Sequence, residues 1–187
     1  MSENFSKKEM EAALVKRIVQ GDKSAMREVY EIHAGPLNSF VRNWLKDPTQ
    51  AADLVHETML AVWKNASKFE GRSSLKSWIF SIARNKSIDS NRRSSKITFT
   101  DQVPEVVDED LAPDDSLEAS QNADKLRSAM KKLSENHQRV LHLAFFEDLK
   151  YEEIAEIEDC AVGTVKTRVM HAKKKLLHIL KEKNKNF

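Results

Sequence analysis

The stretch YEEIAEIEDCAVGTVKTRVMHAKKKLLHIL, residues 151–180, decides the fold of the C-terminal part of this chain. Its opening residues have the apolar spacing of a short helix, and the residues from Glu158 to Ala161 predict a tight turn. After the turn, helical spacing predicts a longer helix that buries Val165, Val169, Ala172 and Leu176. A short helix, a turn and a second helix form a helix-turn-helix, the motif that places its second helix in the major groove of DNA.

The face of this second helix opposite its apolar residues is polar and basic. We expect it to contact DNA through Thr164, Lys166, Thr167, Arg168, His171, Lys174 and Lys175. Arg168 is the best candidate for a bidentate hydrogen bond to guanine, whereas the lysines suit phosphates. An ordinary helical hairpin without a DNA-binding role is the alternative.

The N-terminal part of the chain reads as a helical bundle. Gly35-Pro36 is expected to interrupt its second helix. The next helix, about residues 48–66, is predicted to bury Ala51, Leu54 or Val55, Thr58 and Val62. The same periodicity predicts that Asp53, Glu57, Leu60 and Lys64 lie on its outer face.

A basic helix that starts near Ser74 closes this bundle, after a loop that begins at Phe69. It is predicted to bury Leu75, Trp78, Ile79 and Ile82 and to expose Lys76, Ser81, Arg84, Asn85, Asp89, Arg92 and Arg93. A positive face attracts phosphates, and Asn85 and Asp89, one turn apart, can contact base edges. A solvated basic face without a ligand is the alternative.

The composition is that of a soluble globular protein, with 32% charged and 40% hydrophobic residues among 187. No apolar run approaches the roughly 20 residues that span a membrane, and no signal peptide follows the polar N-terminus. Only four glycines and four prolines interrupt the chain. We therefore expect an all-α protein of the cytoplasm, without membrane insertion.

Charge divides the chain into two basic blocks separated by an acidic segment. Residues 1–97 carry a net charge of +6 and residues 125–187 a net charge of +5, whereas residues 98–124 carry −9. Prolines and like charges favour an extended segment. We expect two small helical domains, residues 1–97 and 122–187, joined by a flexible acidic linker, residues 98–121. A linker that mimics DNA is the alternative to a solvated tether.

No metal or cofactor is expected. The single cysteine, Cys160, excludes an internal disulfide and a multi-cysteine zinc cage. His56-Glu57 could open an HExxH zinc motif, but Leu60 stands where the second histidine would be. Cys160 is expected to be a small packing residue of the turn, with a redox switch as the alternative.

Taken together, these motifs resemble those of the extracytoplasmic-function (ECF) sigma factors, the compact members of the sigma-70 family. YEEIAEIEDCAVGTVKTRVMHAKKKL, residues 151–176, looks like their region 4. DLVHETMLAVWKN, residues 53–65, is similar to their region 2.2, and FEGRSSLKSWIFSIARNKSIDSNRR, residues 69–93, resembles regions 2.3 and 2.4. The likeness covers about residues 10–95 and 120–182.

The resemblance implies a bacterial initiation factor that gives core RNA polymerase its promoter specificity and catalyses nothing itself. In the family, the region 2.2 helix docks on the clamp helices of the β′ subunit, which implies docking through Asp53, Glu57, Leu60 and Lys64. The polymerase β flap and an anti-sigma factor are further implied partners.

The resemblance also implies two contacts with promoter DNA. Regions 2.3 and 2.4 of the family melt the −10 element and capture a flipped base. The positions that correspond here are Phe69, Gly71, Arg72, Ser73, Arg84, Asn85, Lys86, Asp89, Arg92 and Arg93. The −35 element would be read by the basic face of the helix-turn-helix described above.

The helix-turn-helix departs from the family pattern at three positions. Lys150, Asp159 and Ala161 stand where Ser or Thr, Gly and Pro are usual, and Lys150 has no side-chain oxygen to cap a helix. The alternative function is a stand-alone, dimeric helix-turn-helix regulator. Such a regulator would leave the outer face of residues 53–64 and the helix of Asn85 without a role.

Overall fold

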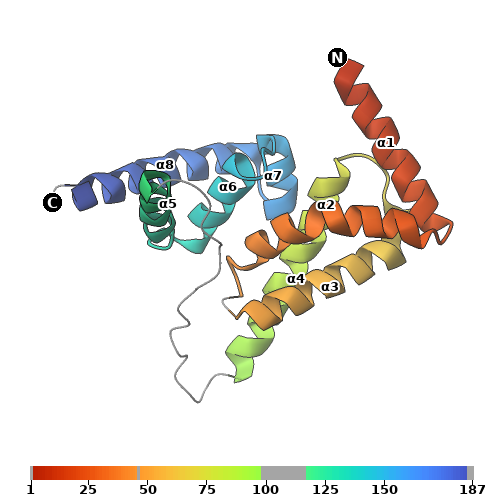
Figure 1. Ribbon diagram of the computed structural model, residues 1–187, viewed down its shortest axis with the longest axis horizontal. Coiled ribbons are helices and arrows are strands. Elements are labelled where there is room, and N and C mark those ends of the chain that lie inside the picture. Colours follow the sequence, from red (N-terminus) through yellow and green to blue (C-terminus); the bar gives the residue numbers. More distant parts are fainter. Residues whose placement is uncertain (1, 46, 98–116, 185–187) are drawn as a thin grey trace.

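The computed structural model describes residues 2–45, 47–97 and 117–184, which fold into helices and the turns between them (Figure 1). No strand occurs in these ranges, so the predicted all-α class is confirmed. Of the predicted linker, residues 98–116 lie outside the described residues. Residues 117–121 are already helical, so the second helical part begins before residue 122.

Four α-helices and one short 3₁₀ helix form the N-terminal half. They are α1 (Ser2–Val19), α2 (Lys23–Val41), α3 (Pro48–Asn65), η1 (Ala66–Lys68) and α4 (Leu75–Ile97). Asp22 caps α2 by accepting hydrogen bonds from the backbone N–H groups of Ser24 and Ala25. Asp47 caps α3 in the same way, and Pro48 occupies its first turn, where a missing N–H costs nothing.

Helix α2 runs through Gly35-Pro36, so the predicted interruption is wrong. Proline inside a helix removes one hydrogen bond and costs about 3 kcal/mol. Here the apolar stripe continues across it, because Val29, Leu37, Phe40 and Val41 are fully buried on the same side. Burial of such side chains contributes about 1.5–3 kcal/mol each, which outweighs the break.

The C-terminal half contains the predicted helix-turn-helix. Its helices are α5 (Leu117–Met130), α6 (Glu135–Phe145), α7 (Tyr151–Glu158) and α8 (Val162–Asn184). Val165, Val169 and Ala172 of α8 are buried as predicted, whereas Leu176 is only half-buried. The turn after α7 is made by Asp159 in the left-handed conformation, with φ 49°, which aspartate tolerates better than most residues.

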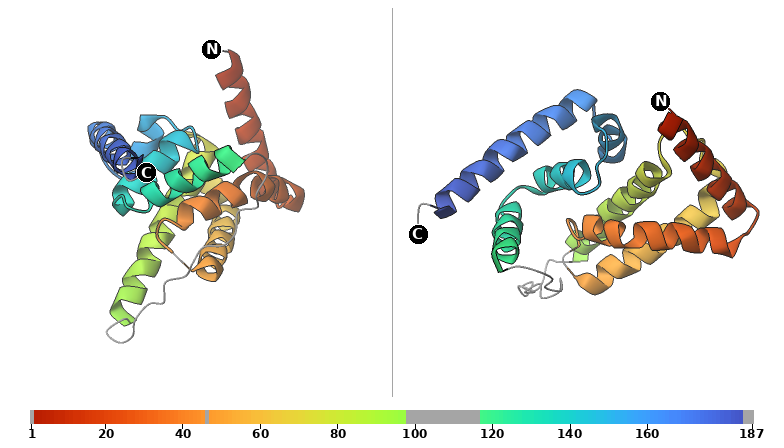
Figure 2. Two further views of the ribbon diagram at one scale, coloured as in Figure 1. Left: turned by 60° about the vertical axis from the view of Figure 1, so that its left-hand side comes forward. Right: turned by 45° about the horizontal axis from the view of Figure 1, so that its top comes forward.

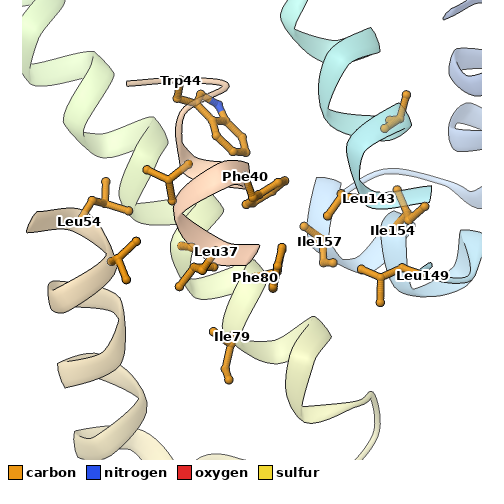
Figure 3. Close-up of a cluster of buried hydrophobic side chains, with 14 of the residues drawn as sticks. Leu37, Phe40, Trp44, Leu54, Ile79, Phe80, Leu143, Leu149, Ile154 and Ile157 are labelled. Carbon is orange, nitrogen blue, oxygen red and sulfur yellow. The ribbon is translucent and has the colours of Figure 1, made fainter. Parts of the chain in front are cut away.

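The two halves share one hydrophobic core. Helix α7 packs against α4, and α6 contacts α2 (Figures 1 and 2). In Figure 3, Phe40 and Phe80 of the N-terminal half face Leu143 and Ile157 of the C-terminal half. The sequence predicted two helical domains but not their arrangement, and in the structure the two pack against each other.

Acid is expected to destabilise this fold through His33, on α2. Burial, reinforced by the positive charges of Lys76 and Lys7 and opposed by Glu147, lowers the pKa of His33 from 6.5 to about 4. As the pH falls, His33 therefore binds a proton in the unfolded chain before it does so in the folded chain. The free energy of unfolding that is fully present above pH 6.5 is lost progressively as the pH falls toward 4.

Thermal unfolding between pH 7.5 and 5 tests this expectation, because carboxyl groups with ordinary pKa values stay ionised over most of that range. The midpoint should fall with pH in the unmodified chain and fall less in His33→Gln. His178→Gln, which replaces a largely exposed histidine, is the matched control. An equal decline in both variants would contradict the role of His33.

Candidate nucleic-acid and protein-binding surfaces

Helix α3 presents the predicted outer face. Asp53, Glu57, Leu60 and Lys64 are all exposed, and Leu60 retains 58% of its accessible surface. The predicted inward residues Ala51, Leu54, Val55, Thr58 and Val62 are all buried. The Thr58 hydroxyl donates a 2.7 Å hydrogen bond to the Leu54 carbonyl, so its burial leaves no unsatisfied donor. An exposed leucine among charged residues is suited to a protein contact.

A polar hollow of about 250 Å³ lies between α3 and α4. It is lined by Gln50, Asp53, Leu54, Glu57, Lys86, Asp89 and Ser90. Lys86 Nζ forms a 3.1 Å ion pair with Glu57 across it. The hollow thus brings two residues of the predicted polymerase-binding set beside two of the predicted −10 set.

The loop before α4 and one face of α4 carry most of the predicted −10 residues. Phe69 packs its ring on Trp78 with centroids 5.3 Å apart, and Gly71 has a φ of 66°, which favours glycine. Arg72 is largely exposed, Ser73 is half-buried, and Asn85, Asp89 and Arg92 are exposed. The side chain of Arg93 lies outside the described residues.

Part of the predicted exposed side of α4 is covered. Lys76, Ser81 and Arg84 are half-buried, because α7 packs on this side of the helix. The Arg84 guanidinium donates through Nη2 to the backbone carbonyl of Glu158 at 2.9 Å. Helical periodicity identified this side correctly as polar but could not show that another helix lies on it.

The predicted recognition helix α8 exposes Lys166, Thr167, His171, Lys174 and Lys175, whereas Thr164 is half-buried. Arg168 lies at the edge of this face and not on it. Its Nη1 is 3.8 Å from Glu158 Oε2 and 3.8 Å from Cys160 Sγ, and its side chain is 29% exposed. The carboxylate draws this guanidinium toward the turn.

Two features of the helix-turn-helix were missed in the sequence. Met170 is 60% exposed, one turn after Lys166 and Thr167 on the open face of α8. Met170 was not predicted to bind DNA because it is apolar, although its helical position places it on the same face as Lys166 and Thr167.

The second feature is the buried Glu158, whose Oε1 accepts from Arg139 Nε at 3.1 Å. The Arg139 guanidinium also stacks over the Trp44 ring at 4.5 Å.

An apolar groove of about 400 Å³ opens between α5, α6 and α8. It is lined by Leu126, Met130, Leu141, Phe145, Phe146, Lys173, Leu176 and Leu177. Phe145 and Phe146 remain 55% and 62% exposed. Large apolar side chains that gather on a soluble surface mark an interaction site.

Neither a metal centre nor a membrane span is found in the part of the chain that the structure describes. No three His, Cys, Asp or Glu residues there are placed to hold a metal ion. Likewise, no described helix is both long and apolar enough to cross a bilayer.

Comparison with known families gives two matches in one chain. The model "Sigma-70 region 2" matches residues 29–97, and "Sigma-70, region 4" matches residues 123–176. Together they include α3, α4, α7 and α8 as far as Leu176.

Relatives of known type match over most of their length. The ECF RNA polymerase sigma factor RpoE of Cereibacter sphaeroides is 31% identical over 155 residues, covering 79% of this chain and 82% of the relative. The ECF RNA polymerase sigma factor SigW of Bacillus subtilis is 24% identical over 178 residues, covering 90% and 95%. Among solved structures, RpoE of Bartonella quintana in complex with the anti-sigma factor NepR has 28% identity and a TM-score of 0.66, covering 83% and 96%.

Proposed function

Because this chain belongs to the ECF sigma factors of the sigma-70 family, we propose that it works as one through the surfaces described above. It is a transcription initiation factor and not an enzyme. It binds core RNA polymerase and directs it to −35 and −10 promoter elements. The observation that carries the assignment of these surfaces is their combination: a basic recognition helix together with a separate exposed face on α3. A dimeric helix-turn-helix regulator has no use for the second surface.

The exposed face of α3 is proposed to dock on the clamp helices of the β′ subunit. Asp53 and Glu57 supply carboxylates that suit a basic partner and steer association, while Leu60 supplies the apolar contact. The apolar groove between α5, α6 and α8 is proposed to hold an apolar segment of the polymerase β flap. Its lining is apolar apart from the lysine that borders it, as such a segment requires.

The loop of Phe69 and the exposed residues of α4 are proposed to hold the melted −10 element. Opening each DNA step costs about 1–2 kcal/mol, which binding of the extruded bases offsets without nucleotide hydrolysis. Asn85 and Asp89 offer edge-reading groups beside the loop, and Arg92 offers charge to the backbone. The exposed face of α8 is proposed to read the −35 element.

An anti-sigma factor is the proposed regulator, and the cytoplasm the proposed location. The Bartonella quintana relative of similar fold is bound to such a factor. The exposed α3 face and the apolar groove are surfaces that an inhibitor could cover to deny them to polymerase.

Permanganate footprinting of promoter DNA tests the proposed function, since permanganate attacks unpaired thymines. Core polymerase with this protein should open a short region around −10, and neither component alone should. The absence of opening by core polymerase with this protein, combined with a shift of duplex DNA by the protein alone, would favour the stand-alone regulator.

Met170 is expected to contribute to recognition of the −35 element. An exposed apolar side chain on a recognition helix can contact the methyl group of thymine. A mismatched base pair in a recognised site costs about 1–3 kcal/mol. Met170→Ala should therefore reduce the preference for one A·T pair by about tenfold in a binding series over single-base variants. Ile32→Ala, at an equally exposed apolar residue of α2, is the control. Unchanged discrimination in Met170→Ala would exclude this contact.

A further inference from the structure

We infer that Glu11 of α1 is a positioning residue for the loop of residues 69–74, because it binds the backbone at the point where this loop enters α4. This role rests on the proposed function, in which the loop helps to hold the melted −10 element. It gives a part in promoter opening to a helix that precedes the segment matched by the region 2 family model. Helix α1 ends at Val19, whereas that segment begins at residue 29.

Glu11 lies on the side of α1 that faces the protein. It precedes Val15 by four positions and Ile18 by seven, so the three residues share one face of the helix, and the two apolar ones are buried. Glu11 itself is half-buried, whereas its neighbours Met10 and Ala12 are exposed. A carboxylate on the packed face of a helix needs hydrogen-bond donors, because burial removes water from it.

The donor is the first backbone N–H group of α4. Leu75 N donates to Glu11 Oε2 at 2.9 Å, across 64 positions of sequence. The first N–H groups of a helix have no acceptor within the helix and carry partial positive charge, which favours a carboxylate. Leu75 is only 2% exposed, so little water is available to replace Glu11 as the acceptor. Removal of the carboxylate would therefore leave this N–H group unsatisfied and loosen the first turn of α4.

Other contacts at the start of α4 hold different atoms. Ser74 Oγ accepts from the backbone N–H of Ser77 at 3.2 Å, as a local N-terminal cap. Glu153 of α7 accepts from the hydroxyl groups of both serines. Neither of these contacts supplies an acceptor to Leu75 N, which distinguishes the contribution of Glu11.

Helix α1 also holds the other end of the loop. The 3₁₀ helix η1, which directly precedes Phe69, packs against α1 (Figure 1). Ala66 of η1 is buried, and its carbonyl accepts from the Phe69 N–H at 3.1 Å. Between the two ends, Glu70, Gly71 and Arg72 are exposed. The path of this short loop is therefore set at both ends by contacts with α1.

Capture of extruded bases depends on where the loop backbone lies. Supporting contacts hold the groups of a binding site in place, and a displacement of about 1 Å weakens the site. Glu11 acts through Leu75 on the neighbouring residues Arg72 and Ser73, which belong to the predicted −10 set. Docking of core polymerase on α3 and reading of the −35 element by α8 do not use this contact.

Promoter opening by three variants of the full chain, each with core polymerase, tests this role. Glu11→Ala should reduce the rate at which −10 thymines become reactive to permanganate by about tenfold, as expected for loss of one helix cap. Glu11→Gln retains an oxygen acceptor and should restore most of the rate. Glu9→Ala removes an exposed carboxylate from the same helix and is the matched control, with an unchanged rate. Affinity for core polymerase should be equal in all four proteins.

A template that is already unpaired around −10 distinguishes positioning from general damage to the protein. On this template the strand separation is supplied, so Glu11→Ala should initiate transcription almost as well as the unmodified protein. A rate unchanged by Glu11→Ala on the duplex promoter, or an equal loss on both templates, would overturn the role of Glu11. Failure of the unmodified protein to open a duplex promoter with core polymerase would instead refute the proposed function.

Discussion

Replacing Glu158 with leucine is expected to lower the free energy of unfolding by about 3–5 kcal/mol, although leucine is the more apolar residue. The Glu158 side chain is only 1% exposed, and Arg139, its ion-pair partner, is 9% exposed. Oε1 accepts from Arg139 Nε at 3.1 Å, and Oε2 lies 3.8 Å from Arg168 Nη1. Removal of the carboxylate would leave the buried Arg139 charge with one remaining carboxylate within 4.0 Å among the described residues, that of the exposed Glu135.

Urea unfolding measures this loss, and two further variants establish its cause. Glu156→Leu changes an exposed carboxylate of the same helix and should shift stability by less than about 0.5 kcal/mol. The double variant Glu158→Leu with Arg139→Met removes both charges and should recover most of the loss, because a buried pair replaced by apolar residues is often neutral. If the double variant is less stable than Glu158→Leu, the uncompensated charge is not the cause.

Leu60→Asp is expected to weaken binding to core RNA polymerase by about 30-fold, which corresponds to about 2 kcal/mol. Leu60 is exposed on α3 beside Asp53 and Glu57 and supplies the apolar contact of this face. Aspartate removes that contact and places a charge that must lose its water where the leucine was. Stability should be almost unchanged, since the side chain packs little within the protein.

Competition binding to core polymerase measures this effect. Met10→Asp is the matched control, because Met10 is an exposed apolar residue of α1, 69% accessible, outside the proposed docking face. The control should bind like the unmodified protein. If Leu60→Asp binds as well as Met10→Asp, the face of α3 is not the docking surface.

Sequence periodicity predicted the parts of the fold that depend on local patterns. The inner and outer faces of α3 and the helix-turn-helix follow from side chains three and four positions apart, and both are confirmed. The left-handed conformation of Asp159 was not predicted, because the sequence showed only that Asp159 stands where glycine is usual. Pro36 was misjudged because local propensity opposes the helix, whereas packing of Leu37 and Phe40 sustains it.

The contact between the halves could not be predicted, because its groups are distant in sequence and many of them are polar. Ser77 and Glu153 look like ordinary surface residues until α7 lies on α4, where Ser77 becomes fully buried. Likewise, Arg139 and Glu158 belong to different helices, and nothing in their spacing indicates a buried pair. Arg84 was expected on an open face of α4, but it is half-buried because α7, which is distant in sequence, packs on that face.

The central claim is that this chain gives core RNA polymerase specificity for a two-part promoter. Transcription by core polymerase and this protein from a pool of randomised promoters tests it most directly, by sequencing the templates of the transcripts. We predict enrichment of two separate elements at a fixed spacing, upstream of a common start site. Enrichment of a single inverted repeat, or transcripts no more selective than those of core polymerase alone, would contradict the claim.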